Sequence, residues 1–284
     1  MAVTYEGLMA TKPLDKRFRY GDRECMLYAV GVGMGEDPVD RAELPFVYEK
    51  ALKVVPSMAT VIAWDDGIIF DTGVDAPKVV HGEQRITLHR PLPTAAEIRS
   101  QVRIREVYDK GPKVGALLVT ETKITDAATG DPLCTNESVV FARGDGGCGA
   151  PAGSPQPLPP TPERDPDHLV TFRTQPNQAL LYRLSGDRNP LHCDPDFAAR
   201  GGFDRPILHG LCTWGFACRA VLKACCAYDP TGMRSFAARF TAPVFPGETL
   251  ETRIWREPAG AHFRTRIVER DIWALSNGFA GLDG

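Results

Sequence analysis

A glycine- and proline-rich segment divides this chain of 284 residues almost in half. From Gly144 to Pro166 the sequence reads GDGGCGAPAGSPQPLPPTPERDP, in which twelve of 23 residues are Gly or Pro. Such a stretch forms neither a helix interior nor a central strand, so we expect a surface linker over 144–166. The length suits two domains of roughly 100 to 150 residues. We therefore predict an N-terminal domain over 1–143 and a C-terminal domain over 167–284.

The C-terminal half combines one long apolar helix with alternating strands. Leu211–Tyr228 is the longest apolar stretch and contains many small residues, which predicts a helix buried on most of its surface. Apolar and polar residues then alternate at 236–240, 250–254 and 263–267, with Pro and Gly turns between the runs. This alternation indicates an antiparallel sheet with one buried face. A long helix wrapped by such a sheet is the hot-dog arrangement, an α+β fold.

The N-terminal half repeats this pattern incompletely. Strands are predicted at Glu97–Tyr108, Val114–Thr125 and Leu133–Ala142, after a turn at Pro91–Pro93 that mirrors the one at Pro243–Pro246. No long apolar helix precedes them, because only Cys25–Gly31 and Phe46–Val54 are candidates and Gly and Pro lie between them. We therefore predict a double hot-dog whose N-terminal copy has lost or reduced its central helix.

Composition narrows the classes of partner. The net charge is −3 and the charged residues are scattered, so nucleic-acid binding is not expected. No run of some 18 apolar residues could span a bilayer. Eight cysteines show no zinc-type spacing, which predicts reduced, buried thiols and no metal site. Neither end of the chain carries a targeting signal, so we expect a cytoplasmic protein with a small-molecule partner.

The segment Tyr182–His192, YRLSGDRNPLH, carries the strongest chemical signal. We predict a strand at 169–173 and a helix at 176–184 closed by Gly186, followed by a helix starting at Asp194. Asp187 and His192 then lie five positions apart on a loop bent at Asn189-Pro190, where both side chains can face one cavity. A carboxylate and an imidazole so placed can hold water, take its proton and deliver a proton to carbon.

Gly210 is the candidate oxyanion donor. It stands at the start of the predicted long helix, where free N–H groups and the positive end of the helix dipole converge. Hydration of a double bond conjugated to a thioester requires such a donor, because charge moves to the carbonyl oxygen as water attacks.

The sequence resembles the MaoC-like hydratases of the hydratase 2 type along nearly its whole length. The resemblance is carried by MLYAVGVG (26–33), FVYE (46–49), HGEQ (81–84), DKG (109–111), YRLSGDRNPLH and GFDRPILHG (202–210). It implies a double hot-dog that hydrates (2E)-enoyl-CoA to (3R)-3-hydroxyacyl-CoA in fatty-acid β-oxidation or related acyl-CoA metabolism. It also implies a homodimer, and no cofactor beyond the coenzyme A of the substrate.

The resemblance also assigns residues. Asp187 and His192 match the catalytic pair, Asn189 a supporting polar residue and Gly210 the oxyanion donor. Substrate contacts are implied for the following residues: His81, Gly82, Lys110, Arg188, Pro190, Leu191 and Phe240. Glu49 matches an important glutamate whose role, catalytic or structural, stays open, as does the question of which member of the catalytic pair takes the first proton.

Plainer interpretations stand beside these. Asp187 also fits a simple Asx turn, Lys110 a solvated hairpin charge, and Phe240 a core residue. We expect His209 to hydrogen-bond the loop rather than act on substrate. Two other functions are retained: a hot-dog acyl-CoA thioesterase, and a non-catalytic acyl-CoA binding protein.

Overall fold

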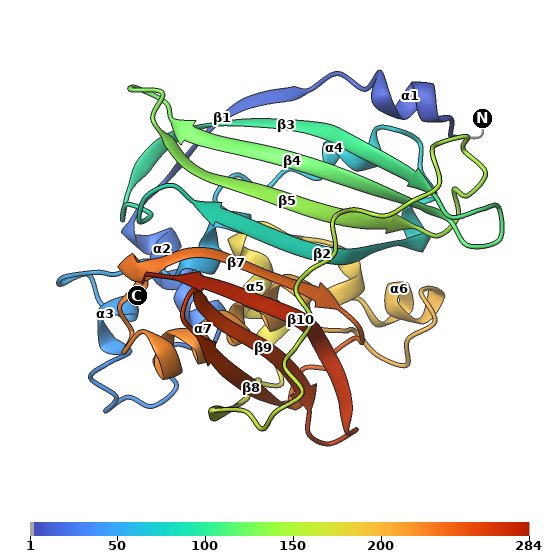
Figure 1. Cartoon of the computed structure of the whole chain (residues 1–284). Coiled ribbons are helices and arrows are strands. Elements are labelled where there is room, and N and C mark those ends of the chain that lie inside the picture. The colour runs from blue at the N-terminus through green and yellow to red at the C-terminus, as the bar shows by residue number, and fades with distance from the viewer. Residues whose placement is uncertain (1–2, 284) are drawn as a thin grey trace.

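One continuous antiparallel sheet of ten strands runs through both halves of the protein, as the computed structural model describes it for residues 3–283 (Figure 1). The strands are β1 Leu14–Tyr20, β2 Val79–Leu88, β3 Ala96–Asp109, β4 Ala116–Asp126, β5 Pro132–Ala142, β6 His168–Arg173, β7 Met233–Phe240, β8 Thr249–Glu257, β9 Gly260–Ile267 and β10 Ile272–Leu282. Their order across the sheet is β1-β3-β4-β5-β2-β7-β10-β9-β8-β6. Met1, Ala2 and Gly284 of the predicted domains lie outside the described residues.

The helices are short except for one. The α-helices are α1 Tyr5–Met9, α2 Asp22–Gly31, α3 Leu44–Val47, α4 Gly67–Phe70, α5 Gln178–Tyr182, α6 Pro195–Arg200 and α7 Gly210–Cys225. The 3-10 helices are η1 Pro56–Thr60, η2 Ala76–Lys78, η3 Arg183–Ser185, η4 Pro190–His192 and η5 Pro230–Gly232. None of the helices among residues 3–283 is long and apolar enough to cross a membrane.

The C-terminal half follows the prediction closely. Helix α7 is buried from Leu211 to Leu222 and contacts strands β6 to β10. The predicted alternation is confirmed, since Leu250, Thr252 and Ile254 point into the core from β8 while their neighbours are more exposed. Strand β10 was not predicted, because Gly278 and Gly281 interrupt its apolar pattern.

The N-terminal half has a sheet without a long central helix, as predicted. The three predicted strands are confirmed as β3, β4 and β5, whereas β1 and β2 were missed because both carry many charged or polar residues. Where α7 lies in the other half, this half places the short helix η1, which contacts β2, β5 and α7. The segment around it is buried, including Val55, Met58 and Ala59.

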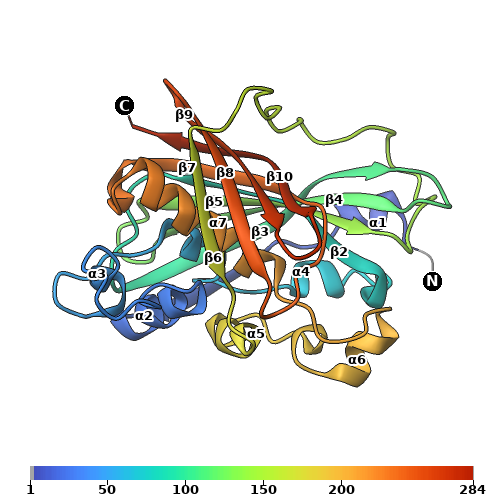
Figure 2. The ribbon, with the colours of Figure 1, turned by 90° about the horizontal axis from the view of Figure 1, so that it is seen from below.

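The predicted linker contains no helix or strand between Ala142 and His168. It runs along the face of the sheet opposite to α2, α5 and α6 (Figure 2). Arg85 of β2 donates to the carbonyl oxygen of Gln156 at 2.5 Å. The indole N–H of Trp255, in β8, donates to the carbonyl oxygen of Arg164 at 2.7 Å. The segment is therefore fixed to strands of both halves. The exact domain boundaries stay a prediction.

Strand pairing and a buried ion pair both join the halves. Strand β2 pairs with β7 from Glu83↔Arg239 to Thr87↔Ser235, which makes the two sheets one. A buried ion pair adds a second connection: the guanidinium of Arg219 in α7 donates to Glu43 at 2.6 and 2.8 Å, and both side chains are under 5% exposed. The phenol of Tyr228 donates to the same carboxylate at 2.7 Å.

Candidate active site

The loop that carries Asp187 begins at a glycine that no other residue could replace without strain. Helix α5 continues directly into η3, and Gly186, with φ of 139°, is the C-cap of η3. A Cβ at this position would lie 2.8 Å from Cβ of Trp64, a residue of the N-terminal half. The N-terminal half therefore packs directly on the predicted catalytic loop.

Asp187 and Asn189 shape the loop through local hydrogen bonds. The Oδ1 atom of Asp187 accepts from the backbone N–H of Asn189 at 3.0 Å, and Oδ1 of Asn189 accepts from the N–H of Leu191 at 3.0 Å. The second bond caps η4, the short helix that contains His192. The Asx-turn interpretation of Asp187 is thus correct for one carboxylate oxygen, and it leaves Oδ2 available for other partners.

His192 is held in one tautomer. Its Nδ1 lies 2.9 Å from the carbonyl oxygen of Ile207, which can only accept, so Nδ1 carries the proton and Nε2 has the free lone pair. The residue is 8% exposed, and this burial lowers the pKa of its imidazole, although the Asp187 carboxylate opposes the shift. His192 is therefore a neutral proton acceptor at pH 7.

Asp187, His192 and His209 form one cluster, in which one polar side-chain atom from each residue lies within 4.8 Å of the others. The rings of His192 and His209 stack, with centroids 3.7 Å apart and planes at 29°. Stacked rings keep their in-plane lone pairs in two nearly parallel planes, whereas the ligands of a zinc site direct their lone pairs at one ion about 2.0–2.1 Å away. The arrangement suits proton transfer better than metal binding.

Gly210 begins α7 directly beside this cluster. As the first helical residue, it has a backbone N–H without an intrahelical acceptor. A Cβ on Gly210 would lie 3.2 Å from the ring of Phe240, so the glycine and this ring are in close contact. Phe240 in turn packs on His81, with ring centroids 4.7 Å apart.

His81 approaches the site from the N-terminal half. A β-bulge lies between His81 and Glu83. A Cβ added to Gly82, inside this bulge, would lie 3.1 Å from the carbonyl oxygen of Val139. Burial lowers the pKa of His81 to about 4, and its Nε2 is buried without a partner among residues 3–283. A neutral imidazole thus faces the site on the side of Phe240.

The other predicted residues lie farther from this cluster or at its edge. Arg188 and Pro190 are exposed on the loop, and Leu191 is half-buried against α6 near Gly201. The ammonium of Lys110 donates to the Gly153 carbonyl and the Ser154 hydroxyl, both at 3.0 Å. Lys110 is therefore fixed to the linker in this structure.

Glu49 is exposed on the segment after α3, and the structure does not bring it to the other predicted residues. The buried glutamate of this region is Glu43, which binds Arg219. Glu43 and Trp64 could not be predicted from the sequence, because their partners Arg219 and Gly186 are more than 120 positions away and no local pattern marks such pairs.

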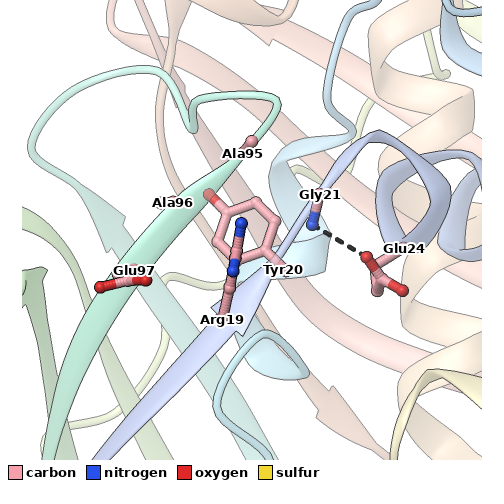
Figure 3. A pocket seen from close by; sticks show the side chains of 7 residues that line it. All are labelled: Arg19, Tyr20, Gly21, Glu24, Ala95, Ala96 and Glu97. Atoms are coloured by element: carbon pink, nitrogen blue, oxygen red, sulfur yellow. Dashed lines mark hydrogen bonds between the residues drawn. The ribbon is translucent and has the colours of Figure 1, made fainter.

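A separate hollow of about 510 Å³ lies between the end of β1, the start of α2 and the start of β3 (Figure 3). Its lining consists of Arg19, Tyr20, Gly21, Glu24, Ala95, Ala96 and Glu97. The carboxylate of Glu24 accepts a hydrogen bond from the N–H of Gly21 at 2.8 Å, and the phenol of Tyr20 donates to the Pro93 carbonyl oxygen at 3.0 Å. None of the predicted site residues contributes to this hollow.

Comparisons with protein families match both halves of the chain. Residues 18–144 match the MFE-2 hydratase 2 N-terminal domain, and residues 157–276 match the MaoC like domain. The peroxisomal enoyl-CoA hydratase 2 of Arabidopsis thaliana is 39% identical over 98% of this chain and 94% of its own length.

Solved structures agree with these matches. The MaoC-like dehydratase from Phytophthora capsici superposes with a TM-score of 0.86 at 31% identity, covering 99% of this chain and 98% of that one. A Mycobacterium tuberculosis protein described as having a double hot-dog fold gives a TM-score of 0.65 at 15% identity, over 99% of this chain and 98% of that one. The last likeness concerns the fold alone, and it confirms the predicted double hot-dog.

Proposed function

Because this chain belongs to the hydratase 2 family of MaoC-like proteins, we propose that it is an (R)-specific enoyl-CoA hydratase. It adds water reversibly to (2E)-enoyl-CoA and gives (3R)-3-hydroxyacyl-CoA. The observation that carries the proposal is that Asp187, His192 and the N-terminus of α7 lie together, next to the rings of Phe240 and His81.

The proton balance follows from the state of His192. Its Nδ1–H is bound to the Ile207 carbonyl and its Nε2 has a free lone pair, so neutral His192 begins the reaction as a proton acceptor. As the water oxygen bonds to C3, one water proton goes to Nε2 of His192, and the electrons of the double bond move toward the carbonyl oxygen. The same proton must then pass to C2, because the pair holds no other. Both additions occur from the side of the pair, which predicts syn hydration.

The other groups support these steps. The carboxylate of Asp187 stabilises the imidazolium of His192 while the proton is held there. The N–H of Gly210 donates to the thioester oxygen as charge develops on it. His81 and Phe240 border the thioester, with Gly82, Arg188, Pro190 and Leu191 around it, and Lys110 reaches coenzyme A only by leaving its contacts with the linker. We propose that no metal or redox cofactor takes part.

The test is an assay with two readouts on crotonyl-CoA or 2-decenoyl-CoA. We expect the enoyl absorbance to fall while free thiol stays at the blank level. Release of thiol would support the thioesterase instead, and no change in either signal would support a binding protein. Chiral analysis of the product checks the (3R) configuration.

Gly210→Ala tests the oxyanion assignment. The added methyl group meets the Phe240 ring at 3.2 Å, so either the ring or the start of α7 must shift. Since loss of an oxyanion donor costs about 10²–10³ in kcat, we expect its displacement to lower kcat by about tenfold to a hundredfold. Phe240→Leu, measured alone and combined with Gly210→Ala, is the control. The assignment is wrong if Gly210→Ala keeps full kcat, or if relieving the contact restores none of it.

The pH profile tests the state of His192. Because the pKa of His192 lies below 6.5 in the folded protein, the neutral form predominates at and above pH 6.5. We expect kcat/KM to be level near pH 8 and to fall in acid with a midpoint below pH 6.5. Circular dichroism at each pH distinguishes protonation of His192 from unfolding. This control is needed because burial lowers the pKa of His81 and His209 in the folded protein, so the unfolded chain binds more protons in acid and is favoured there. An acidic limb centred above pH 6.5 would contradict the assignment.

Pathway, assembly and location extend the proposal. We propose a role in fatty-acid β-oxidation or related acyl-CoA metabolism, a cytoplasmic location and a homodimer. The edge between β2 and β7 is already paired within the chain, so β1 and β6 are the sheet edges left for a second copy in the described part of the chain. Sedimentation equilibrium tests the dimer, and microscopy of the tagged protein tests the location.

A further inference from the structure

His209 contacts every part of the catalytic arrangement, although it contributes no atom to the proton balance above. It is 1% exposed and is the N-cap residue of α7, directly before Gly210. Its Nε2–H donates to the backbone carbonyl oxygen of Asp187 at 3.1 Å. Its ring stacks on His192 at 3.7 Å.

We propose that His209 is a positioning residue that fixes Asp187 and His192 relative to each other and to the Gly210 N–H. The inference rests on the proposed hydratase function. Each contact sets one degree of freedom: the hydrogen bond fixes the Asp187 backbone, the stack fixes the plane of the His192 ring, and the helix start ties both to the oxyanion donor. No other side chain among residues 3–283 makes both contacts.

The role requires a neutral imidazole rather than a charged one. The Nδ1 atom of His209 is buried and has no hydrogen-bond partner within the described chain, so a proton there would gain no acceptor. Burial, followed by the neighbouring His192, lowers the pKa of His209 to about 2. When His192 becomes an imidazolium during turnover, a second cation 3.7 Å away would oppose it, and a neutral ring does not.

Two substitutions separate the contacts. His209→Phe keeps an aromatic ring against His192 but removes the N–H donor to Asp187, whereas His209→Gln keeps a donor but removes the ring. We expect His209→Phe to lower kcat by about tenfold to a hundredfold with KM changed by less than about twofold, since the loss concerns alignment in the transition state. His209→Gln should recover part of this loss. His89→Phe, at an exposed histidine bonded to Thr135, is the matched control and should leave both constants unchanged.

A residue that acts through Asp187 loses its effect when Asp187 is disabled. Adding His209→Phe to Asp187→Asn should therefore change the residual kcat by less than about twofold, far from additive behaviour. The proposal is overturned if the two effects multiply, if His209→Phe raises KM with kcat intact, or if kcat is unchanged.

A measurement without turnover keeps this test apart from that of the proposed function. The ¹H–¹⁵N ring correlations of His192 should report the Nδ1–H tautomer in the wild-type protein and shift in His209→Gln, because the stacked ring is lost. Unchanged His192 signals in that variant would overturn the positioning role even in an active hydratase. Absence of hydration together with shifted signals would remove the proposed function and retain the positioning of His192.

Discussion

Asp187→Asn is expected to lower kcat for enoyl-CoA hydration by about 10³-fold while the protein stays folded. General acid–base groups typically contribute about 10²–10⁴-fold, and Asp187 has two separable roles here. In the wild-type protein Oδ1 of Asp187 accepts from the N–H of Asn189 at 3.0 Å. An Asn side chain at position 187 keeps an oxygen that can accept this bond, so the Asx turn is expected to persist. It lacks the negative charge that stabilises protonated His192. Steady-state kinetics with 2-decenoyl-CoA measures the loss.

Two companion variants sharpen this result. Asp187→Ala removes the turn as well as the charge, so it should lose stability in addition to activity, and thermal unfolding distinguishes it from Asp187→Asn. His192→Gln should be as inactive as Asp187→Asn and should bind coenzyme A normally in calorimetry. More than a tenth of the wild-type kcat in Asp187→Asn or His192→Gln would show that the reacting proton takes another route.

The catalytic loop could be predicted because its information is local. A carboxylate, an imidazole and a Gly/Asn/Pro turn lie within eleven residues, from Tyr182 to His192, and the hydrogen bonds that fix them are to near neighbours. Helix α7 was predicted for the same reason, since burial on all sides gives a long apolar segment. Local patterns of this kind identify the element and the chemistry together.

The contacts that complete the site are long-range and leave no local pattern. Strand β2 carries His81, but its sequence VVHGEQRITL interrupts the alternation with a bulge at Gly82 and with charged residues that pair across the outer face. The stack of His192 on His209 joins positions seventeen apart, and the contact of Trp64 with Gly186 joins the two halves. The resemblance to a family marked His81 as a site residue, whereas Trp64 required the structure.

The importance of Glu49 stays a prediction of the resemblance. Its side chain is exposed, whereas Glu43, six residues earlier, is buried against α7. From sequence, Glu43 is an ordinary surface residue between Ala42 and Leu44. Its burial depends on Arg219, an arginine inside an otherwise apolar helix, and the two lie 176 positions apart.

The ion pair of Glu43 with Arg219 gives the largest expected effect on stability. The carboxylate accepts two bonds from the guanidinium, one from the Tyr228 phenol at 2.7 Å and one from the N–H of Gly35 at 2.9 Å. Breaking a buried pair by removing one partner costs about 3–5 kcal/mol, because an uncompensated charge stays buried. Glu43→Gln should therefore lower the free energy of unfolding by about that amount and Tm by roughly 5–15 °C.

We expect Glu43→Gln to lose stability because the charge of Arg219 stays buried without a partner, rather than because the attraction between the two side chains is lost. A second substitution distinguishes these two causes. With Glu43→Gln, Arg219 retains a distant contact with Glu36 at 3.9 Å and the face of Phe172 at 3.7 Å, neither of which replaces a bidentate carboxylate. Adding Arg219→Met removes the stranded cation, so the double variant should be more stable than Glu43→Gln alone. Asp283→Asn, at the pair with Arg234 whose side chains are about half exposed, is the control and should cost less than about 1 kcal/mol. Urea unfolding of the wild type, Glu43→Gln, the double variant and Asp283→Asn measures the free energy of unfolding of each. A double variant no more stable than Glu43→Gln would mean that the pair contributes by direct attraction, and an unchanged Glu43→Gln would mean that it does not hold the two halves together.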